Sequence, residues 1–304
     1  MIIKNHVKTY SISWISSSYD KDTALGIINT YYIPETIDEL QELCISLFTS
    51  GEELRVVGHT SNIYFLPNTN ISNLISVRKL NRWQIEGNLL TCQCGVNVKA
   101  LSKAMIDEGF EGFAGLIDLP GTIGGAIYGN ASVGKYSITN MLESVKLLNE
   151  NGQIEVYSKE DMNFQYRSSA LKRQEMKGII LSCSLKLTMG DSGKEKRTAE
   201  GIHVWRVKNQ PGPLNNLGTT ALLNNHSKYG FLAFSIAKLV AFGRSPIIKK
   251  NLVLKMLGAS HLSPYLFGYN RFIWKDPKAH EFFYDYIRFI NKAYKYPKLE
   301  IEVI

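Results

Sequence analysis

The chain has 304 residues, a length typical of about two domains. With 44% hydrophobic and 20% charged residues it can bury a large core, which excludes long-range disorder. The net charge of +8 suits an anionic partner. Because Lys and Arg are dispersed rather than clustered, we expect no nucleic-acid partner.

Neither a secretory signal nor a membrane span is expected. The N-terminal residues lack an apolar h-region with a cleavage site. The longest apolar stretch, 231–242, contains Lys238 and is shorter than the roughly 20 residues that cross a bilayer. These features predict a soluble, cytoplasmic protein.

The cysteines and histidines indicate no metal site and no disulfide framework. Cys92 and Cys94 would share one face of a strand, but two further zinc ligands at suitable spacing are not evident. Four cysteines in a chain this long are typical of buried structural thiols in a reducing compartment.

The first hundred residues predict alternating helices and strands. Residues 35–48 form a helical pattern, with Thr36 as N-cap and Glu39 three residues later. Residues 54–67 predict strand, glycine turn and strand, and 71–94 predict further short strands. An amphipathic helix is expected over residues 97–109.

The middle of the chain begins with an unusual glycine-rich stretch, 109–134, whose backbone must turn repeatedly. The dipeptide Asn151-Gly152 predicts a hairpin, and residues 158–161 could start a short helix. Residues 178–188 predict a strand, and an exposed helix is expected from 193 to 210.

The last hundred residues predict a second, smaller domain. Pro211-Gly-Pro213 marks a break, and we place the domains at 1–205 and 206–304. An aromatic helix is expected over 277–295. The residues on its apolar face are Phe282, Tyr286, Phe289 and Ala293.

Two glycine-bearing turns, at residues 57–62 and 119–126, could bind phosphate. Successive backbone N–H groups with Ser or Thr hydroxyls suit a pyrophosphate. Neither turn matches G-x-G-x-x-G or the P-loop, which disfavours ordinary nucleotide-binding folds.

Several motifs occur in an order that resembles one enzyme family. Residues 58–62 match G-x-G-S-N at Gly58, Ser61 and Asn62, and 118–126 followed by Asn130-Ala131 are similar to G-I-P-G-[ST]-V-G-G-A with its later N-A-G. Downstream, 164–168 resembles F-x-Y-R-x-S, 206–211 resembles R-x-x-x-Q-P and 299–303 resembles L-x-P-E-V. This pattern resembles the UDP-N-acetylenolpyruvoylglucosamine reductase family of bacterial cell-wall precursor synthesis.

The resemblance implies an α+β (α/β) protein. Its FAD-binding domain, of the PCMH or vanillyl-alcohol-oxidase type, would consist of two α/β subdomains, and a smaller C-terminal α+β domain would bind substrate. NADPH would reduce non-covalently bound FAD, and hydride would pass to the enolpyruvyl β-carbon of a UDP-sugar. A side-chain acid would then protonate the α-carbon.

The resemblance also implies the site residues. Those expected to bind FAD are Gly58, His59, Thr60, Ser61, Asn62, Pro120, Gly121, Thr122, Gly124, Gly125, Ala126 and Asn130. Those expected to bind substrate are Tyr166, Arg167, Arg206 and Gln210. Those expected to be catalytic are Arg167, Thr219 and Glu302.

Physical chemistry supports two of these roles and leaves an alternative for each. Negative charge accumulates on the substrate carboxylate as an enolate forms, so the permanent cation of Arg167 suits it; the alternative is an arginine in a surface ion pair. Glu302 would act as a general acid or polarise the substrate, with a pKa tuned from about 4.3 by burial. Its alternative is a solvated glutamate near the C-terminus.

At two positions the sequence departs from the residues that the family uses for catalysis and phosphate binding. Thr219 replaces the family's catalytic serine, and Leu222 replaces its lysine. The β-branch of threonine restricts the side chain, so the hydroxyl can be misplaced. These departures leave open a re-purposed FAD- or nucleotide-sugar-binding paralogue, and His59 leaves open a flavin oxidase with covalent FAD, although a solvent-facing loop histidine is the better interpretation.

Overall fold

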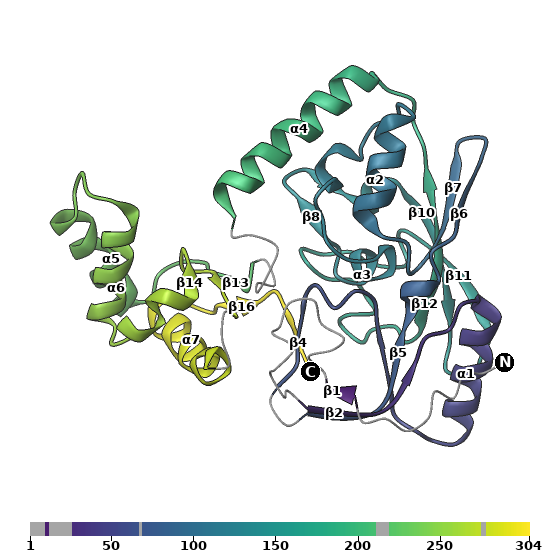
Figure 1. Ribbon diagram of the computed structural model, residues 1–304, viewed down its shortest axis with the longest axis horizontal. Helices are drawn as coiled ribbons and strands as arrows, with labels where there is room; N and C mark the ends of the chain where they lie inside the picture. The colour runs from purple at the N-terminus through teal and green to yellow at the C-terminus, as the bar shows by residue number, and fades with distance from the viewer. Residues whose placement is uncertain (1–9, 12–25, 67–68, 211–218, 275–277) are drawn as a thin grey trace. The chain divides into compact units, whose positions relative to one another are not determined.

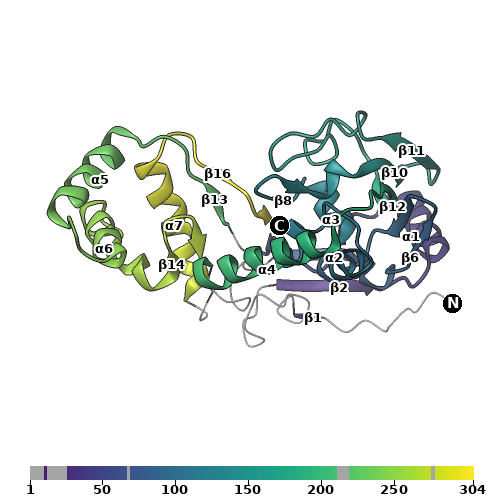
Figure 2. The same ribbon diagram turned by 90° about the horizontal axis from the view of Figure 1, so that it is seen from above.

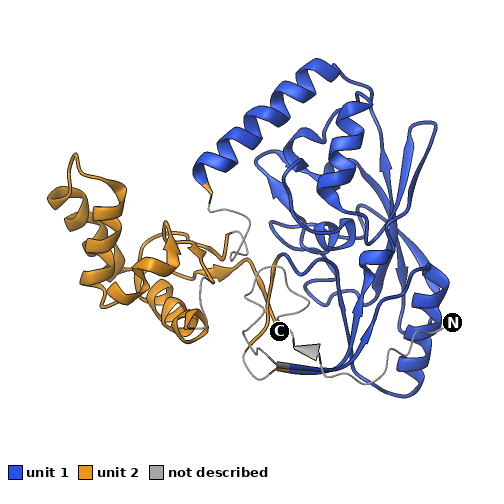
Figure 3. Cartoon of the chain, in the orientation of Figure 1, with its two compact units in different colours: residues 1–11, 27–61, 70–209 blue, residues 12–26, 62–69, 210–304 orange. Residues whose placement is uncertain are grey.

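The computed structural model contains mixed α/β structure, as the sequence predicted (Figure 1). The residues it describes are 10–11, 26–66, 69–210, 219–274 and 278–304. The chain forms two compact units (Figure 3). Unit 1 comprises 1–11, 27–61 and 70–209, and unit 2 comprises 12–26, 62–69 and 210–304. Unit 2 thus begins a few residues after the expected boundary and also takes in 62–69, which the sequence had assigned to the first domain.

The described residues of unit 1 form two larger sheets and the short antiparallel pair of β8 (Ser132–Val133) with β9 (Tyr136–Ser137). The five strands of the antiparallel sheet, in spatial order, are β11 (Ile154–Ser158), β10 (Leu142–Leu148), β12 (Ile179–Lys186), β7 (Leu89–Gln93) and β6 (Trp83–Glu86). Those of the second sheet are β1 (Tyr10–Ser11), β2 (Gly26–Tyr32), β5 (Thr69–Ser76) and β3 (Leu54–Val57). β3 and β5 are parallel. The strands predicted over 71–94 and 178–188 are therefore confirmed.

Helices α1 (Ile37–Thr49) and α2 (Val98–Asp107) form where expected. The α1 N-terminus is capped by Thr36, whose Oγ1 accepts a hydrogen bond from Glu39 N at 3.1 Å. The Glu39 carboxylate in turn accepts one from Glu35 N at 2.8 Å. The residues that α1 buries in the core of unit 1 are Leu40, Leu43, Cys44 and Leu47.

The exposed helix expected after residue 193 is α4 (Ser192–Asn209), of which only Ala199 is buried. It packs on α2 and on the 3₁₀ helix η3 (Ala114–Leu116) (Figures 1 and 2). The other short elements of unit 1 are η2 (Val77–Lys79), β8 (Ser132–Val133), β9 (Tyr136–Ser137), η4 (Ile138–Asn140) and α3 (Ile123–Tyr128).

One of two local predictions in the middle of the chain is confirmed. Strands β10 and β11 form a hairpin in which Gly152 has φ +76° and donates its N–H to Asn149 O at 3.0 Å. The prediction that residues 158–161 start a short helix is wrong, because the structure has a turn there. The Asp161 carboxylate accepts hydrogen bonds from both the N–H and the hydroxyl of Ser158, at 2.8 and 2.7 Å, which closes a single turn instead.

The four cysteines are buried and make no disulfide. Burial raises the pKa of Cys44 and of Cys94 to about 12, so both remain thiols at neutral pH. Within the described part of the chain, no group of three His, Cys, Asp or Glu residues could hold a metal ion. No helix of that part is both long and apolar enough to cross a bilayer.

Unit 2 consists of helices and two-stranded sheets. Its helices are α5 (Lys228–Val240), α6 (Pro246–Met256), η5 (Ser260–Tyr265) and α7 (Ala279–Ala293). Its paired strands are β13 (Ala221–Leu222) with β16 (Lys298–Leu299), β14 (Leu266–Phe267) with β15 (Arg271–Phe272), and β4 (Ile63–Tyr64) with β17 (Glu302–Val303). The last pair is parallel and joins the 62–69 segment to the C-terminus.

Aromatic side chains form the core of unit 2. The predicted face of α7 is largely confirmed, because Tyr286, Phe289 and Ala293 are buried, while Phe282 is half-buried. Tyr64 stacks on Trp274 with ring centroids 4.3 Å apart. Such pairs contribute about 0.5–1.5 kcal/mol beyond their burial.

His280 makes this core sensitive to acid. It is buried beside Tyr64, whose hydroxyl oxygen lies 3.1 Å from Nδ1, and burial lowers the pKa of His280 to about 4. Folded protein therefore resists a protonation that the unfolded chain accepts below pH about 6.5. The contribution of neutral His280 to the free energy of unfolding is fully present above that pH and is lost as the pH falls towards 4.

We expect wild-type protein to lose about 2 kcal/mol of unfolding free energy between pH 7 and 4.5 through this group. Urea unfolding at both pH values should show a smaller loss for His280→Gln. A matched control is His261→Gln, because His261 is partly exposed beside Asp285. Equal pH dependence in wild type and His280→Gln would contradict the assignment.

Candidate functional site

The two glycine turns lie against each other in unit 1. The first follows β3, and a Cβ on Gly58 would collide with the Thr122 hydroxyl of the second. Gly121 has φ +116°, and a Cβ there would lie 2.9 Å from Ser61 Oγ. The structure therefore brings together two segments that the sequence singled out about 60 residues apart.

Backbone hydrogen bonds hold the second turn in place. Gly121 O accepts from Val98 N at 3.1 Å, and Ile123 N donates to Val96 O at 2.9 Å. Thr122 caps α3, where its Oγ1 accepts from Gly125 N at 3.3 Å. The turn is thus fixed by its own chain before any ligand binds.

The glycines of this turn serve different purposes. Gly124 packs against the core, since a Cβ there would lie 2.9 Å from Cys94 Cβ. Gly125 is exposed, and a Cβ would meet only Thr122 Oγ1, at an ordinary 3.5 Å. Protein packing does not explain glycine at 125, whereas close approach of a ligand to bare backbone does. A diphosphate fits this surface.

The first turn contains a residue in strained geometry. Thr60 has φ 52°, is buried, and donates its hydroxyl hydrogen to His59 O at 2.8 Å. The motif that this turn resembles has glycine at that place, and the structure keeps a conformation that favours glycine. A β-branched side chain there costs about 1–2 kcal/mol.

His59 is half-buried rather than facing solvent as we had expected. Its Nδ1 lies 3.3 Å from Asn97 Nδ2, and the Asn97 Oδ1 caps α2 by accepting from Ala100 N. Burial, and secondarily the charge of Arg78, lower the pKa of His59. The amide therefore donates to Nδ1 of a neutral ring.

Left-handed backbone is concentrated at the candidate site. Six described non-glycine residues have positive φ, and three of them are Thr60, Asn130 and Arg167, at 52°, 43° and 53°. Conformations of this kind cost of order 1–3 kcal/mol and persist where surrounding structure enforces them, commonly at functional sites.

Asn130 joins the second turn to the turn that presents Arg167. Its side-chain amide donates to Gln165 O at 2.7 Å. Its Oδ1 accepts from Ser137 Oγ at 3.1 Å and from Thr139 Oγ1 at 3.0 Å. The expected position of Asn130 beside the cofactor turn is thus also a structural link to the expected substrate residues.

Tyr166 and Arg167 form the tip of a tight turn. Gln165 and Ser168 exchange backbone hydrogen bonds of 3.0 and 3.1 Å on either side of them. Tyr166 is exposed, and Arg167 Cζ lies 5.7 Å from the centroid of its ring. The guanidinium is therefore held on a short, closed turn.

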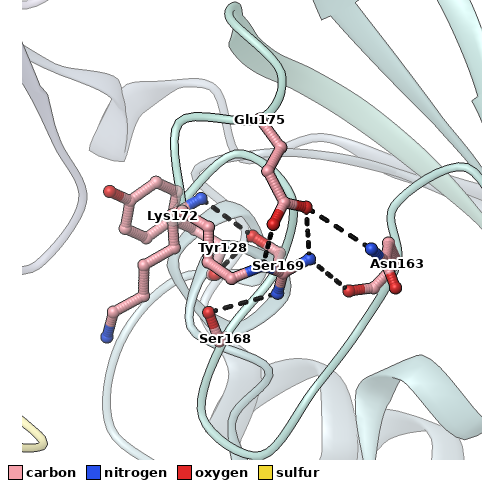
Figure 4. A network of polar contacts seen from close by, with 7 residues as sticks. Tyr128, Asn163, Ser168, Ser169, Lys172 and Glu175 are labelled. Atoms are coloured by element: carbon pink, nitrogen blue, oxygen red, sulfur yellow. Dashed lines mark hydrogen bonds and ion pairs between the residues drawn. The ribbon is translucent and has the colours of Figure 1, made fainter.

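A polar network includes Ser168, which closes this turn (Figure 4). Arg173 donates through Nε and Nη2 to the Glu175 carboxylate, each at 2.7 Å, and through Nη2 to Asn163 O at 2.8 Å. Its Nη1 donates to Ser168 Oγ at 3.3 Å, and Ser169 Oγ donates to Tyr128 O at 2.7 Å. Sequence reasoning missed Arg173; its only signal was a second arginine shortly after the Y-R-x-S motif.

Asp118 is a further residue that the motifs did not assign. It lies 2.7 Å from His203 Nδ1 of α4 and 3.3 Å from Lys99 Nζ of α2. Its partial burial raises the pKa of the carboxyl, but the hydrogen bond and charge of His203, and then those of Lys99, outweigh it and lower the pKa overall. The pair of contacts fixes the start of the second turn.

The remaining residues expected in unit 1 lie close to these elements in sequence. Pro120 is exposed directly before Gly121, and Ala126 is buried in α3. Arg206 is half-buried near the end of α4.

Unit 2 brings together two of the expected residues, Asn62 and Glu302. Asn62 O accepts from Glu302 N at 2.8 Å, and Asn62 Nδ2 donates to Glu300 O at 2.9 Å. Glu300 N donates to the carbonyl of Thr220, the neighbour of Thr219, at 2.9 Å. Asn62 thus contacts the C-terminal segment, which the sequence alone did not indicate.

The two threonines at 219 and 220 differ in environment. Thr220 is fully buried, and its Oγ1 accepts from Phe272 N at 2.9 Å, so its hydroxyl has a structural partner. Thr219 is half-buried. Gln210 is half-buried just after α4, whereas Pro211 of the same motif lies outside the described residues.

Comparisons with known proteins agree with this geometry. Residues 29–158 match the family model described as FAD binding domain. A UDP-N-acetylenolpyruvoylglucosamine reductase of Caldicellulosiruptor saccharolyticus is 31% identical over 51% of this chain and 49% of that protein. One of Clostridium beijerinckii is 26% identical over 64% of each chain. The chain thus spans about half to two thirds of the length of these relatives.

The fold is similar to that of a solved relative over nearly its whole length. The structure of UDP-N-acetylenolpyruvylglucosamine reductase (MurB) from Thermus caldophilus is similar with a TM-score of 0.68, at 19% identity, over 98% of both chains. Residues 29–158 thus match an FAD binding domain, and the fold of the chain is similar to that of this MurB structure.

Proposed function

We propose that this chain is an FAD-dependent reductase that uses NADPH to reduce the enolpyruvyl group of a UDP-sugar in cell-wall precursor synthesis. The observation that carries the proposal is the direct contact between the two glycine turns, at which Gly125 exposes bare backbone. When bound, FAD supplies the transfer of hydride from NADPH to the enolpyruvyl β-carbon. The free, buried thiols suit the cytoplasm.

The residues of unit 1 would hold the cofactor and orient the substrate. The turns at 58–61 and 120–126 would bind the diphosphate of FAD with Asn130 behind them. Arg167 would hold the substrate carboxylate and stabilise the charge that develops on it. Tyr166 and Arg206 would add contacts to the substrate.

The residues of unit 2, the proposed substrate domain, would supply the proton that the substrate α-carbon receives. Thr219 would donate it to the α-carbon through its hydroxyl, and Glu302 would act as a general acid or polarise the substrate. Asn62 and Gln210 would complete the cofactor and substrate contacts. The hydrogen bonds that connect residues 62, 220, 300 and 302 support a common location for Asn62, Glu302 and the neighbour of Thr219 within the unit.

An absorbance spectrum between about 350 and 500 nm tests the cofactor, because oxidised flavin absorbs there. We expect a yellow protein whose band bleaches when NADPH is added without oxygen. NADPH oxidation should then depend on UDP-N-acetylglucosamine enolpyruvate. A colourless, folded protein that takes up no FAD at micromolar concentration would overturn the proposal, and a flavin-loaded protein without turnover would overturn only the substrate.

A second candidate function is a re-purposed FAD- or nucleotide-sugar-binding paralogue. Leu222, in place of the lysine, lies in β13, whose backbone pairs with β16. Its alkyl side chain cannot bind a phosphate. We therefore expect a protein with Leu222 to bind a phosphorylated substrate or reductant weakly.

Restoring the motif distinguishes the two candidates. In an active reductase, Thr219→Ser should raise kcat about tenfold or more, because it removes the β-branch that restricts the hydroxyl. Adding Leu222→Lys should lower the KM for NADPH or for the UDP-sugar. Steady-state kinetics should show no gain for the matched control Thr220→Ser, whose hydroxyl is already bonded to Phe272 N. Absence of any gain in the double variant would favour the paralogue.

A further inference from the structure

Acidic residues are absent from a long part of the chain. Lys and Arg are dispersed throughout, but between residues 201 and 275 there are ten of them and no Asp or Glu. The positive charge of this stretch exceeds the net charge of +8 of the entire chain. It includes α5 and α6, which therefore have basic side chains without any acidic ones to balance them.

Helix α5 is apolar on its outer side. Its buried residues are Gly230, Ala233 and Ala237, so small side chains face the protein. The large ones are exposed, with 67% of Phe231 and 78% of Leu239 accessible to solvent. An ordinary surface helix has the opposite arrangement.

The exposed apolar surface continues through the loop 241–245 into α6. Phe242 is 82% exposed and Ile247 is 64% exposed. Helices α5 and α6 lie side by side in both views, so these residues belong to one end of a helical hairpin (Figures 1 and 2). The other exposed apolar residues of this surface are Tyr229, Leu232, Val240 and Ile248.

The hairpin end is ordered rather than frayed. Ser245 Oγ caps α6 by accepting from Ile247 N at 3.3 Å, and Pro246 is the first residue of the helix. Ala241 is buried, and its N–H donates to Ala237 O at 3.0 Å. The fold thus holds Phe242 outwards at an energetic cost that a monomer in water would not recover.

Basic side chains lie among these apolar ones. Lys228, Lys238 and Arg244 are exposed. Lys250 is not part of this set, because its Nζ donates to the carbonyls of Ser263 and Leu266 at 3.0 and 2.8 Å. Exposed Phe and Leu flanked by Lys and Arg are typical of surfaces that bind a bilayer interface.

We propose that the outer side of α5, the loop 241–245 and the start of α6 bind the surface of an anionic lipid bilayer. Phe242 and Leu239 would enter the boundary between head groups and acyl chains, while Lys238 and Arg244 contact lipid phosphates. A second copy paired through the same surface is disfavoured, because a two-fold axis would bring the like charges of α5 and α6 together, and neither helix has a carboxylate to neutralise them.

Co-sedimentation with lipid vesicles tests the proposal on the full chain. Wild-type protein should bind vesicles containing about 30% phosphatidylglycerol in phosphatidylcholine, bind pure phosphatidylcholine much less, and dissociate as salt rises. The double variant Leu239→Glu, Phe242→Glu should lower the partition coefficient more than tenfold. Lys238→Gln with Arg244→Gln should lower it severalfold.

The double variant Ile154→Glu, Val156→Glu is the matched control, because both residues are exposed on β11 in unit 1 and the two substitutions add the same charge. Its vesicle binding should be nearly that of wild type, and urea unfolding should show that all variants fold. Equal binding of wild type and the Leu239→Glu, Phe242→Glu variant would overturn the proposal. Absence of vesicle binding would overturn it too, and light scattering that then shows self-association lost in that variant would assign the surface to a second copy.

Discussion

Alanine at Gly125 should weaken FAD binding at least about tenfold without unfolding the protein. The exposed position offers space for a methyl group, and alanine in a helix is favoured over glycine by up to about 1 kcal/mol. The free energy of unfolding of the apoprotein should therefore stay constant or rise. The methyl group would instead keep a diphosphate away from the backbone, as titration of apoprotein with FAD by flavin fluorescence should show.

The neighbouring substitution Gly124→Ala should instead lower the free energy of unfolding of the apoprotein. Its methyl group would lie 2.9 Å from Cys94 Cβ and 3.1 Å from Cys94 O, in the core of unit 1. Overpacking of this kind costs about 1–3 kcal/mol. Urea unfolding should show that loss in the apoprotein. If Gly125→Ala bound FAD as tightly as wild type, the cofactor would not approach this turn closely, and the proposed site would be wrong.

Local sequence signals account for much of unit 1. Thr36 and Glu39 predicted the start of α1 because an N-cap and its partner act within four residues. Asn151-Gly152 predicted the β10–β11 hairpin for the same reason, since the turn needs only its own residues. The short helix after Ser158 failed because a local side-chain hydrogen bond can close a turn as well as cap a helix.

Local sequence patterns could not predict the contacts between segments that are far apart in the chain. Nothing in the sequence near Asn62 indicates that it bonds to Glu300 and Glu302, some 240 positions away. The contact between Asp118 and His203 likewise depends on how α4 packs, and α4 has almost no apolar face that would predict its docking. The sequence predicted that both glycine turns bind one cofactor, and the packing of Gly58 on Thr122 shows that the two turns lie against each other.

Alanine at Arg167 should lower kcat by about a hundredfold to a thousandfold while leaving stability nearly unchanged. Removal of one group that stabilises developing negative charge typically has this effect. Alanine retains a Cβ, so the backbone strain at φ 53° is the same in both proteins. Steady-state turnover of the UDP-sugar and urea unfolding measure the two quantities. Lysine should restore part of the activity, because it keeps the charge but not the two-pronged hydrogen bonding.

Arg173 provides the matched control because it lies six positions away and has a structural role. Its guanidinium bonds to Glu175, Asn163 and Ser168, so Arg173→Ala should release the loop behind the turn and lower stability. Its loss of activity should follow the loss of folded protein and be recovered at lower temperature. Arg167→Ala should show no such recovery. If Arg167→Ala instead lost stability and kept its turnover, Arg167 would be a surface ion-pair residue rather than the carboxylate-binding group.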